Sequence, residues 1–149
     1  MLFFGTYVPL HGVEFILEAA EILKEEEGLE FTLIGNGQQY ARTRSDAARR
    51  RLDRLQFVSE WVRPSALVEY IDASDICLGI FGTTDKAARV IPYKVYDALA
   101  VGRPVVTRDS PAIREILEHE KSALLCPPGD GAALAAALIR LMEDRELRL

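Results

Sequence analysis

The stretch "IPYKVYDALAVGRPVV" (Ile91 to Val106) contains a helix start, a glycine turn and the beginning of an apolar strand. Pro92 is typical of the first turn of a helix, and Gly102 lies in the turn that ends it. The β-branched residues that close the stretch predict a buried strand. Lys94 and Asp97 are three residues apart and therefore share one face of the predicted helix. A helix followed at once by a buried strand is a unit from which α/β folds are built.

The same alternation continues on both sides of this stretch. Short apolar runs predict strands, and amphipathic stretches with helical spacing predict helices between them. Right-handed crossovers between such strands give a parallel sheet covered on both faces. We therefore expect an α/β fold: a doubly wound, Rossmann-like parallel sheet of about six strands with helices on both faces. The predicted strands contain "LFF", "LEFTLI", "QFVSEWV", "DICLGIF", "PVVT" and "SALLC", and the predicted helices cover 13–28, 38–55, 63–74, 92–101, 110–120 and 131–148.

The length and composition fit one globular domain. The chain has 149 residues, of which 49% are hydrophobic and 28% charged, so it can bury a single core. The net charge of -5 disfavours binding of nucleic acid through bulk charge. No apolar run reaches the roughly 18 residues of a membrane span, and "MLFFGTYV" lacks the basic leader of a signal peptide. We expect a cytoplasmic protein, or one that is peripheral at the inner face of a membrane.

The cysteines and histidines give no metal-site pattern. Cys77 and Cys126 stand in apolar surroundings without a nearby partner in the sequence. Buried thiols are therefore expected, with a disulfide or a metal pair as the alternative. His11 and His119 are too few and too far apart for a histidine-rich metal site.

Four segments are candidates for a binding site, because ligands of open α/β sheets bind beyond the carboxyl ends of the strands. They cover 5–12, 35–38, 81–94 and 107–111. Glycines in them let backbone amides approach a ligand, and the helix starts that follow favour phosphate. The same residues also have plainer interpretations. Gly5, Gly35 and Gly37 are typical of simple turns. Asp85, Lys86 and Arg89 are typical of a solvated polar loop. Outside these segments, the arginine run 49–51 is typical of a solvated helix face, with contact to an anionic membrane surface as the alternative.

Lys94 and Asp97 carry the most chemical information. Lys94 falls in the first turn of the predicted helix, where a cation is mildly unfavourable against the helix dipole unless an anion docks beside it. Asp97, one turn later, can accept hydrogen bonds from a pair of sugar hydroxyls. A charged hydrogen bond of this kind contributes about 1.5–3 kcal/mol, or roughly tenfold to a hundredfold in affinity. The alternative is an exposed ion pair worth a few tenths of a kcal/mol, and the spacing alone leaves both interpretations open.

Several stretches, in their order and spacing, match one known pattern. "FFGTYVPLHGVEFILEAA", "FTLIGNGQ", "PYKVYDALAVGRPVV" and "ALLCPPGDGAALAAALIRLMED" together resemble the C-terminal half of the group 1 glycosyltransferases (family 4, GT-B fold). The resemblance spans nearly the whole sequence. It implies that 1–149 is a single C-terminal domain, one half of a GT-B fold, which binds a nucleotide-diphosphate-sugar donor. It also implies an N-terminal acceptor domain outside this chain, retention of the anomeric configuration, and no required metal or other cofactor.

The resemblance assigns roles to individual residues. Asp97 matches the second acid of the family's E-x7-E motif, which holds the donor ribose. Gly5 matches the glycine of the first loop, whose backbone approaches the phosphates or the sugar. Lys94 matches a lysine of the variant form P-x-K-x-x-E, which lies beside the diphosphate.

The sequence also departs from the family pattern. Arg89 stands where the first acid of E-x7-E is expected, and Thr6 and His11 stand where the first loop usually has Arg and Lys. Thr6 and His11 remain candidate donor contacts, and Lys86 and Arg89 are expected to compensate for the lost charge together with Lys94. No residue is assigned as catalytic.

The function expected from the resemblance is therefore donor binding for sugar transfer. The full-length protein is expected to transfer a hexosyl group to a glycan or a lipid-linked acceptor, and this chain alone is expected to be inactive. One alternative is a degenerate, non-catalytic GT-B module kept for assembly or regulation. Another is one half of a sugar-nucleotide epimerase. The sequence predicts neither the base, the sugar, the acceptor nor the oligomeric state.

Overall fold

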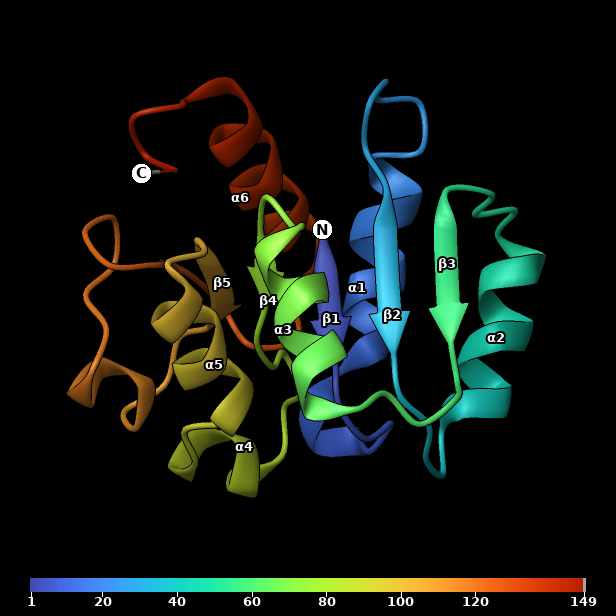
Figure 1. Ribbon diagram of the computed structural model, residues 1–149, viewed down its shortest axis with the longest axis horizontal. Coiled ribbons are helices and arrows are strands. Elements are labelled where there is room, and N and C mark those ends of the chain that lie inside the picture. Colours follow the sequence, from blue (N-terminus) through green and yellow to red (C-terminus); the bar gives the residue numbers. More distant parts are fainter. Residues whose placement is uncertain (149) are drawn as a thin grey trace.

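Six short strands form one fully parallel sheet in the computed structural model, which describes residues 1–148 (Figure 1). The strand order is β3-β2-β1-β4-β5-β6, which is the order of a Rossmann fold. This confirms the predicted doubly wound sheet and supplies the order that the sequence did not. The strands are β1 (Leu2–Phe4), β2 (Phe31–Ile34), β3 (Leu55–Val58), β4 (Cys77–Leu78), β5 (Val105–Arg108) and β6 (Leu124–Cys126).

Helices cover both faces of the sheet, and α3 and α5 lie in front of it in Figure 1. Helix α1 packs against α6 and α2 on one face, whereas α3 packs against α5 on the other. The helices are α1 (Val13–Ile22), α2 (Tyr40–Arg49), α3 (Pro64–Asp72), α4 (Asp85–Arg89), α5 (Tyr93–Val101) and α6 (Gly131–Glu143), with short 3-10 helices η1 (Pro9–His11) and η2 (Ile113–Glu115).

The core consists of two apolar clusters, one on each face of the sheet. Successive residues of a strand point to opposite faces, and β1 shows this clearly. Phe3 belongs to the cluster under α1 and α6, whereas Leu2 and Phe4 belong to the cluster under α3 and α5. The short run "LFF" therefore contributes to both halves of the core.

Two predicted segments were wrong for identifiable reasons, and the helices predicted over 13–28, 38–55 and 131–148 end earlier, at Ile22, Arg49 and Glu143. The segment expected to be a polar loop contains α4, because the Thr84 side chain accepts a hydrogen bond from the Ala87 amide at 3.2 Å and caps the helix. The helix expected over 110–120 is only the single turn η2. The amide of Glu118 donates to the Ser122 hydroxyl at 2.8 Å, and that of Glu120 to the Ala123 carbonyl at 2.9 Å. These bonds replace the helical ones and return the chain to β6.

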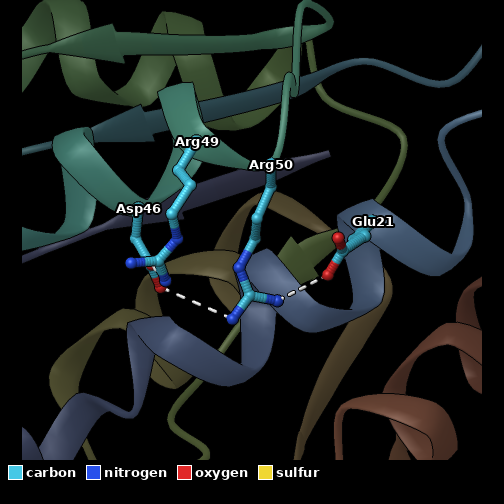
Figure 2. Close-up of polar contacts among 4 residues, drawn as sticks. All are labelled: Glu21, Asp46, Arg49 and Arg50. Carbon is cyan, nitrogen blue, oxygen red and sulfur yellow. Dashed lines mark hydrogen bonds and ion pairs between the residues drawn. The ribbon is translucent and has the colours of Figure 1, made fainter.

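The arginine run after α2 is only partly a solvated face. Arg50 donates to Glu21 on α1 at 2.7 Å and to Asp46 on α2 at 3.4 Å, so it ties the two helices together (Figure 2). Its side chain is 21% exposed, whereas that of Arg49, which pairs with Asp46, is 76% exposed. The predicted solvated face is confirmed for Arg49 and is wrong for Arg50.

Within residues 1–148 no helix has the length and apolar character needed to cross a bilayer. In the same range, the His, Cys, Asp and Glu side chains form no group of three that could hold a metal ion. Cys77 and Cys126 are buried free thiols, as predicted. Burial raises the pKa of the Cys77 thiol to about 11 and outweighs the opposite effect of the N-terminal ammonium and Arg103, so a reactive thiolate is disfavoured there.

Candidate functional site

The middle of the sheet contains a topological switch point. Strands β1 and β4 are neighbours, and from them the chain winds outward in both directions. The crevice beyond the carboxyl ends of such strands is where ligands of doubly wound sheets bind. Here the loop after β1, the loop after β4 and the start of α5 meet at that edge, and the α4 helix lies against η1.

The loops at this edge are packed backbone against backbone. The Phe81 amide donates to the His11 carbonyl at 2.9 Å. A Cβ added to Gly12 would lie 2.3 Å from the Gly82 nitrogen, and one added to Gly35 would lie 2.0 Å from the Gly5 carbonyl oxygen. Gly12, Gly35 and Gly82 therefore allow the loops to pack closely because they have no Cβ.

Lys94 points from α5 into this edge of the sheet and ends over an aromatic ring. Its Nζ lies 3.9 Å from the centroid of the Phe3 ring, and only 6% of the residue is exposed. A Cβ added to Gly5, whose φ is +143°, would lie 2.9 Å from this Nζ and 3.1 Å from Cε1 of His11. The structure therefore brings together three of the predicted site residues, Gly5, His11 and Lys94. We call this group, with Phe3, the Lys94 site.

The side-chain nitrogen of Lys94 has no oppositely charged partner among residues 1–148. Nζ is buried and has no hydrogen-bond partner among residues 1–148. Burial therefore lowers the pKa of Lys94 well below its ordinary value. The pKa of His11 is lowered from 6.5 to about 4, first by burial and second by the charge of Lys94, while a hydrogen bond from its Nδ1 to the Thr6 carbonyl acts in the opposite direction. Burial thus disfavours a proton on either basic group, and a proton on one of them disfavours a proton on the other.

Asp97 has a different environment from Lys94 although the two residues are one helical turn apart. Lys94 is buried, whereas Asp97 is exposed. No ion pair joins them among residues 1–148, where Lys94 forms no salt bridge at all. The interpretation as an exposed ion pair is therefore wrong, and the Asp97 carboxylate is free to accept hydrogen bonds from outside the chain.

The remaining predicted residues lie around the Lys94 site, and their side chains do not enter it. Lys86 and Arg89 are exposed on α4. Thr6 is also exposed, and it contributes its carbonyl oxygen to His11. All three lie at the carboxyl edge of the sheet, and within residues 1–148 no hydrogen bond or ion pair joins their side chains to Lys94.

Arg108 is a further residue of this edge that the sequence analysis did not single out. It ends β5 and is buried, and its guanidinium donates to the Gly82 carbonyl and, at 3.4 Å, to the Asp109 carbonyl. It thereby ties the loop after β4 to the end of β5. Its position inside the candidate segment 107–111 was the only signal in the sequence.

Three cavities lie at the opposite edge of the sheet. Their volumes are about 250, 310 and 380 Å³, and they are lined by residues at the amino ends of strands, such as Val105, Phe31 and Met1. Neither Lys94 nor Asp97 lines any of them. The candidate site is therefore defined by the Lys94 side chain and the switch point, and not by these cavities.

Comparison with known proteins identifies the family. The family model described as "Glycosyl transferases group 1" matches residues 1–144. The amylovoran biosynthesis glycosyltransferase AmsK of Erwinia amylovora is 34% identical over 134 residues, which cover 89% of this chain and 33% of AmsK. A phosphatidyl-myo-inositol mannosyltransferase of Mycobacterium leprae is 27% identical over 150 residues, covering 99% of this chain and 38% of that protein. The chain thus spans about a third of the length of these relatives.

Solved structures show the same fold. The C-terminal domain of the group 1 glycosyl transferase LpcC from Francisella tularensis superposes with a TM-score of 0.82 at 19% identity, covering 99% of this chain and 76% of that one. Anabaena Alr3699/HepE in complex with UDP-glucose gives a TM-score of 0.84 at 20% identity, covering 99% of this chain and 40% of that one. The sheet is that of the C-terminal domain of GT-B enzymes. The match of the family model over nearly the whole sequence shows that the chain belongs to the group 1 glycosyltransferases.

Proposed function

We propose that this chain is the donor-binding half of a retaining glycosyltransferase and holds the diphosphate of a nucleotide sugar at the Lys94 site. The observation that carries the proposal is the Lys94 Nζ, which is buried without a partner at the switch point of the sheet. A buried cationic group without a counter-charge is costly, and a diphosphate would supply the missing charge. HepE, which shares the fold, has been solved in complex with UDP-glucose.

The other groups of the edge have defined parts in this proposal. The first amides of α5 follow Pro92, which caps the helix without a side-chain bond, and they favour an anion together with Lys94. Asp97, one turn on, would hold the ribose, a role that rests on the family resemblance and on its exposed carboxylate. Lys86 and Arg89 would face the outer phosphate oxygens. Charge stabilisation of the departing nucleoside diphosphate by these groups would supply the catalysis, without a required metal.

The acceptor would bind outside this chain. A glycan or a lipid-linked acceptor would meet the donor in a cleft formed with an N-terminal domain, at the cytoplasmic side or at the inner face of a membrane. The chain alone is therefore expected to bind donor and to transfer no sugar. Sugar transfer from UDP-glucose by residues 1–149 alone would contradict this half-site proposal.

Calorimetric titration with UDP, GDP and ADP tests donor binding directly. We expect one of the three to bind, and Asp97→Ala to weaken its affinity by roughly tenfold to a hundredfold, because a charged hydrogen bond is lost. Asp53→Ala is the matched control, since Asp53 is exposed and lies at the amino edge of the sheet. Binding that is equally strong in Asp97→Ala would remove Asp97 from the site.

A non-catalytic module is the second candidate function. It is favoured by Thr6 and His11 in the first loop and by Arg89 at the position of the first acid, because these residues lack the usual charges of the family. Failure of all three nucleotides to bind or to raise the melting temperature would support this second function over the first.

A further inference from the structure

The Lys94 site contains very few groups that can carry charge. It is bounded by Phe3 on β1, by Gly5 directly after β1, and by His11 on η1. Tyr7 packs edge-on against the Phe3 ring with the centroids 5.9 Å apart, and burial raises the pKa of its phenol, which stays neutral. Within residues 1–148 no carboxylate pairs with Lys94 or His11. A proton on this site must therefore reside on Lys94 or on His11.

The free site disfavours that proton. Burial is the cause that lowers the pKa of Lys94, and the pKa of His11 lies at about 4. The Phe3 ring favours an ammonium through a cation–π contact, but such a contact is weaker than the desolvation of an unpaired charge. The Lys94 nitrogen, which is buried without a hydrogen-bond partner among residues 1–148, therefore favours its uncharged form. Protonated His11 would repel an ammonium at Lys94, so the two groups do not charge together.

We propose that Lys94 is an uncharged amine in the free protein and takes up one proton from solvent when a diphosphate docks beside it. The proposal rests on the proposed donor site and adds its coupling to protons. An anion at hydrogen-bond distance favours the charged form of the amine, so the amine, one proton and the diphosphate combine into an ammonium–diphosphate pair. The cation appears only when its partner is present, which explains how the fold tolerates Lys94 in a buried position.

The sign of the pH effect follows from the proton count. Because the complex binds one more proton than the free protein, affinity must fall as pH rises. Between the lowered pKa of free Lys94 and its higher pKa in the complex, the affinity should fall by about tenfold per pH unit. Below that window the affinity no longer depends on this proton.

Titration calorimetry in two buffers of different ionisation enthalpy, such as Tris and HEPES, counts the proton. The measurement is made at pH 8 with UDP, GDP or ADP, because a terminal phosphate with a second pKa of about 6 is then fully ionised. We expect uptake of about one proton per bound nucleotide and an affinity about tenfold lower at pH 9. Binding without proton uptake would overturn this inference and leave the donor site standing. Absence of binding by all three nucleotides would overturn the proposed function itself.

Variants identify the group that takes the proton. Lys94→Arg carries a permanent charge and should bind without proton uptake, provided that circular dichroism shows it folded. In His11→Gln, each bound nucleotide should still take up about one proton at pH 8, whatever the affinity of this variant. Loss of that proton uptake would place the proton on the imidazole and contradict the proposal. Lys24→Met removes an exposed lysine far from the site and is the matched control, with uptake unchanged.

Discussion

Replacing Lys94 by methionine is expected to stabilise the fold and to remove nucleotide binding. Methionine has a similar length and no polar atom to satisfy, so it fills the place over Phe3. Leaving a buried donor without a partner costs about 1–3 kcal/mol, and Lys94 Nζ is such a donor. For a chain of this size, the gain corresponds to a melting temperature higher by roughly 3–10 °C. The affinity for a nucleoside diphosphate should fall by about a hundredfold or more, because the amine that becomes the cation beside the bound diphosphate is lost.

The pH dependence of stability provides an independent check on Lys94→Met. The folded protein holds the pKa of Lys94 below the ordinary value, so the unfolded chain binds more protons between the two values. The contribution of Lys94 to stability should therefore rise as pH increases through that window towards about 10. Buried Cys77 and Tyr7, whose pKa values are raised, act in the opposite direction in the native protein and in Lys94→Met alike, so the contribution of Lys94 is the difference between the two proteins. The methionine variant lacks this group and should lack the rise.

Thermal unfolding between pH 7 and pH 10, combined with nucleotide titration, measures both effects. Lys24→Met is again the control, and neither its melting temperature nor its affinity should change appreciably. A lower melting temperature in Lys94→Met would mean that the native amine makes a stabilising contact. That result would contradict the view that Lys94 is kept for binding at the expense of stability.

The sequence predicted the sheet well because each strand is short, apolar and followed by a glycine or polar loop. The helix from Tyr93 to Val101 was predicted from Pro92 and Gly102, and both cap it in the structure. A full helix was predicted where only the single turn η2 forms, because the amides of Glu118 and Glu120 bond to Ser122 and Ala123, further along the chain. Local spacing carries no information about such partners.

The candidate site was predictable in its residue types and less so in its geometry. Spacing of three placed Lys94 and Asp97 on one helix face, yet one is buried and the other exposed. The difference arises because Lys94 meets Phe3 and Gly5, which precede it by about ninety residues in the sequence. The contact between Gly12 and Gly82 and the role of Arg108 likewise depend on neighbours that only the folded sheet brings together.

Replacing Gly12 by alanine is expected to be the most damaging change in the loops of the site. Gly12 has φ +63°, and its added Cβ would lie 2.3 Å from the Gly82 nitrogen and 2.6 Å from the Phe81 carbonyl carbon. The left-handed backbone costs alanine about 1–2 kcal/mol, and the clash with backbone atoms adds about 1–3 kcal/mol. The clash cannot be relieved by rotating a side chain, so the loops after β1 and β4 must separate. His11, the neighbour of Gly12, then moves away from Lys94, and nucleotide affinity should fall with stability.

Gly28→Ala separates the two costs of that substitution. Gly28 has φ +80°, and an added Cβ would meet nothing within 4 Å, so alanine there bears the backbone cost of about 1–2 kcal/mol alone. Urea unfolding of both variants should show Gly12→Ala losing at least about twice as much free energy of unfolding as Gly28→Ala. Only Gly12→Ala should lose nucleotide affinity, because Gly28 lies beyond the carboxyl end of α1 and shortly before β2, at the opposite edge of the sheet. Equal losses of stability would mean that the two loops can part without cost, and the site would then not depend on their close packing.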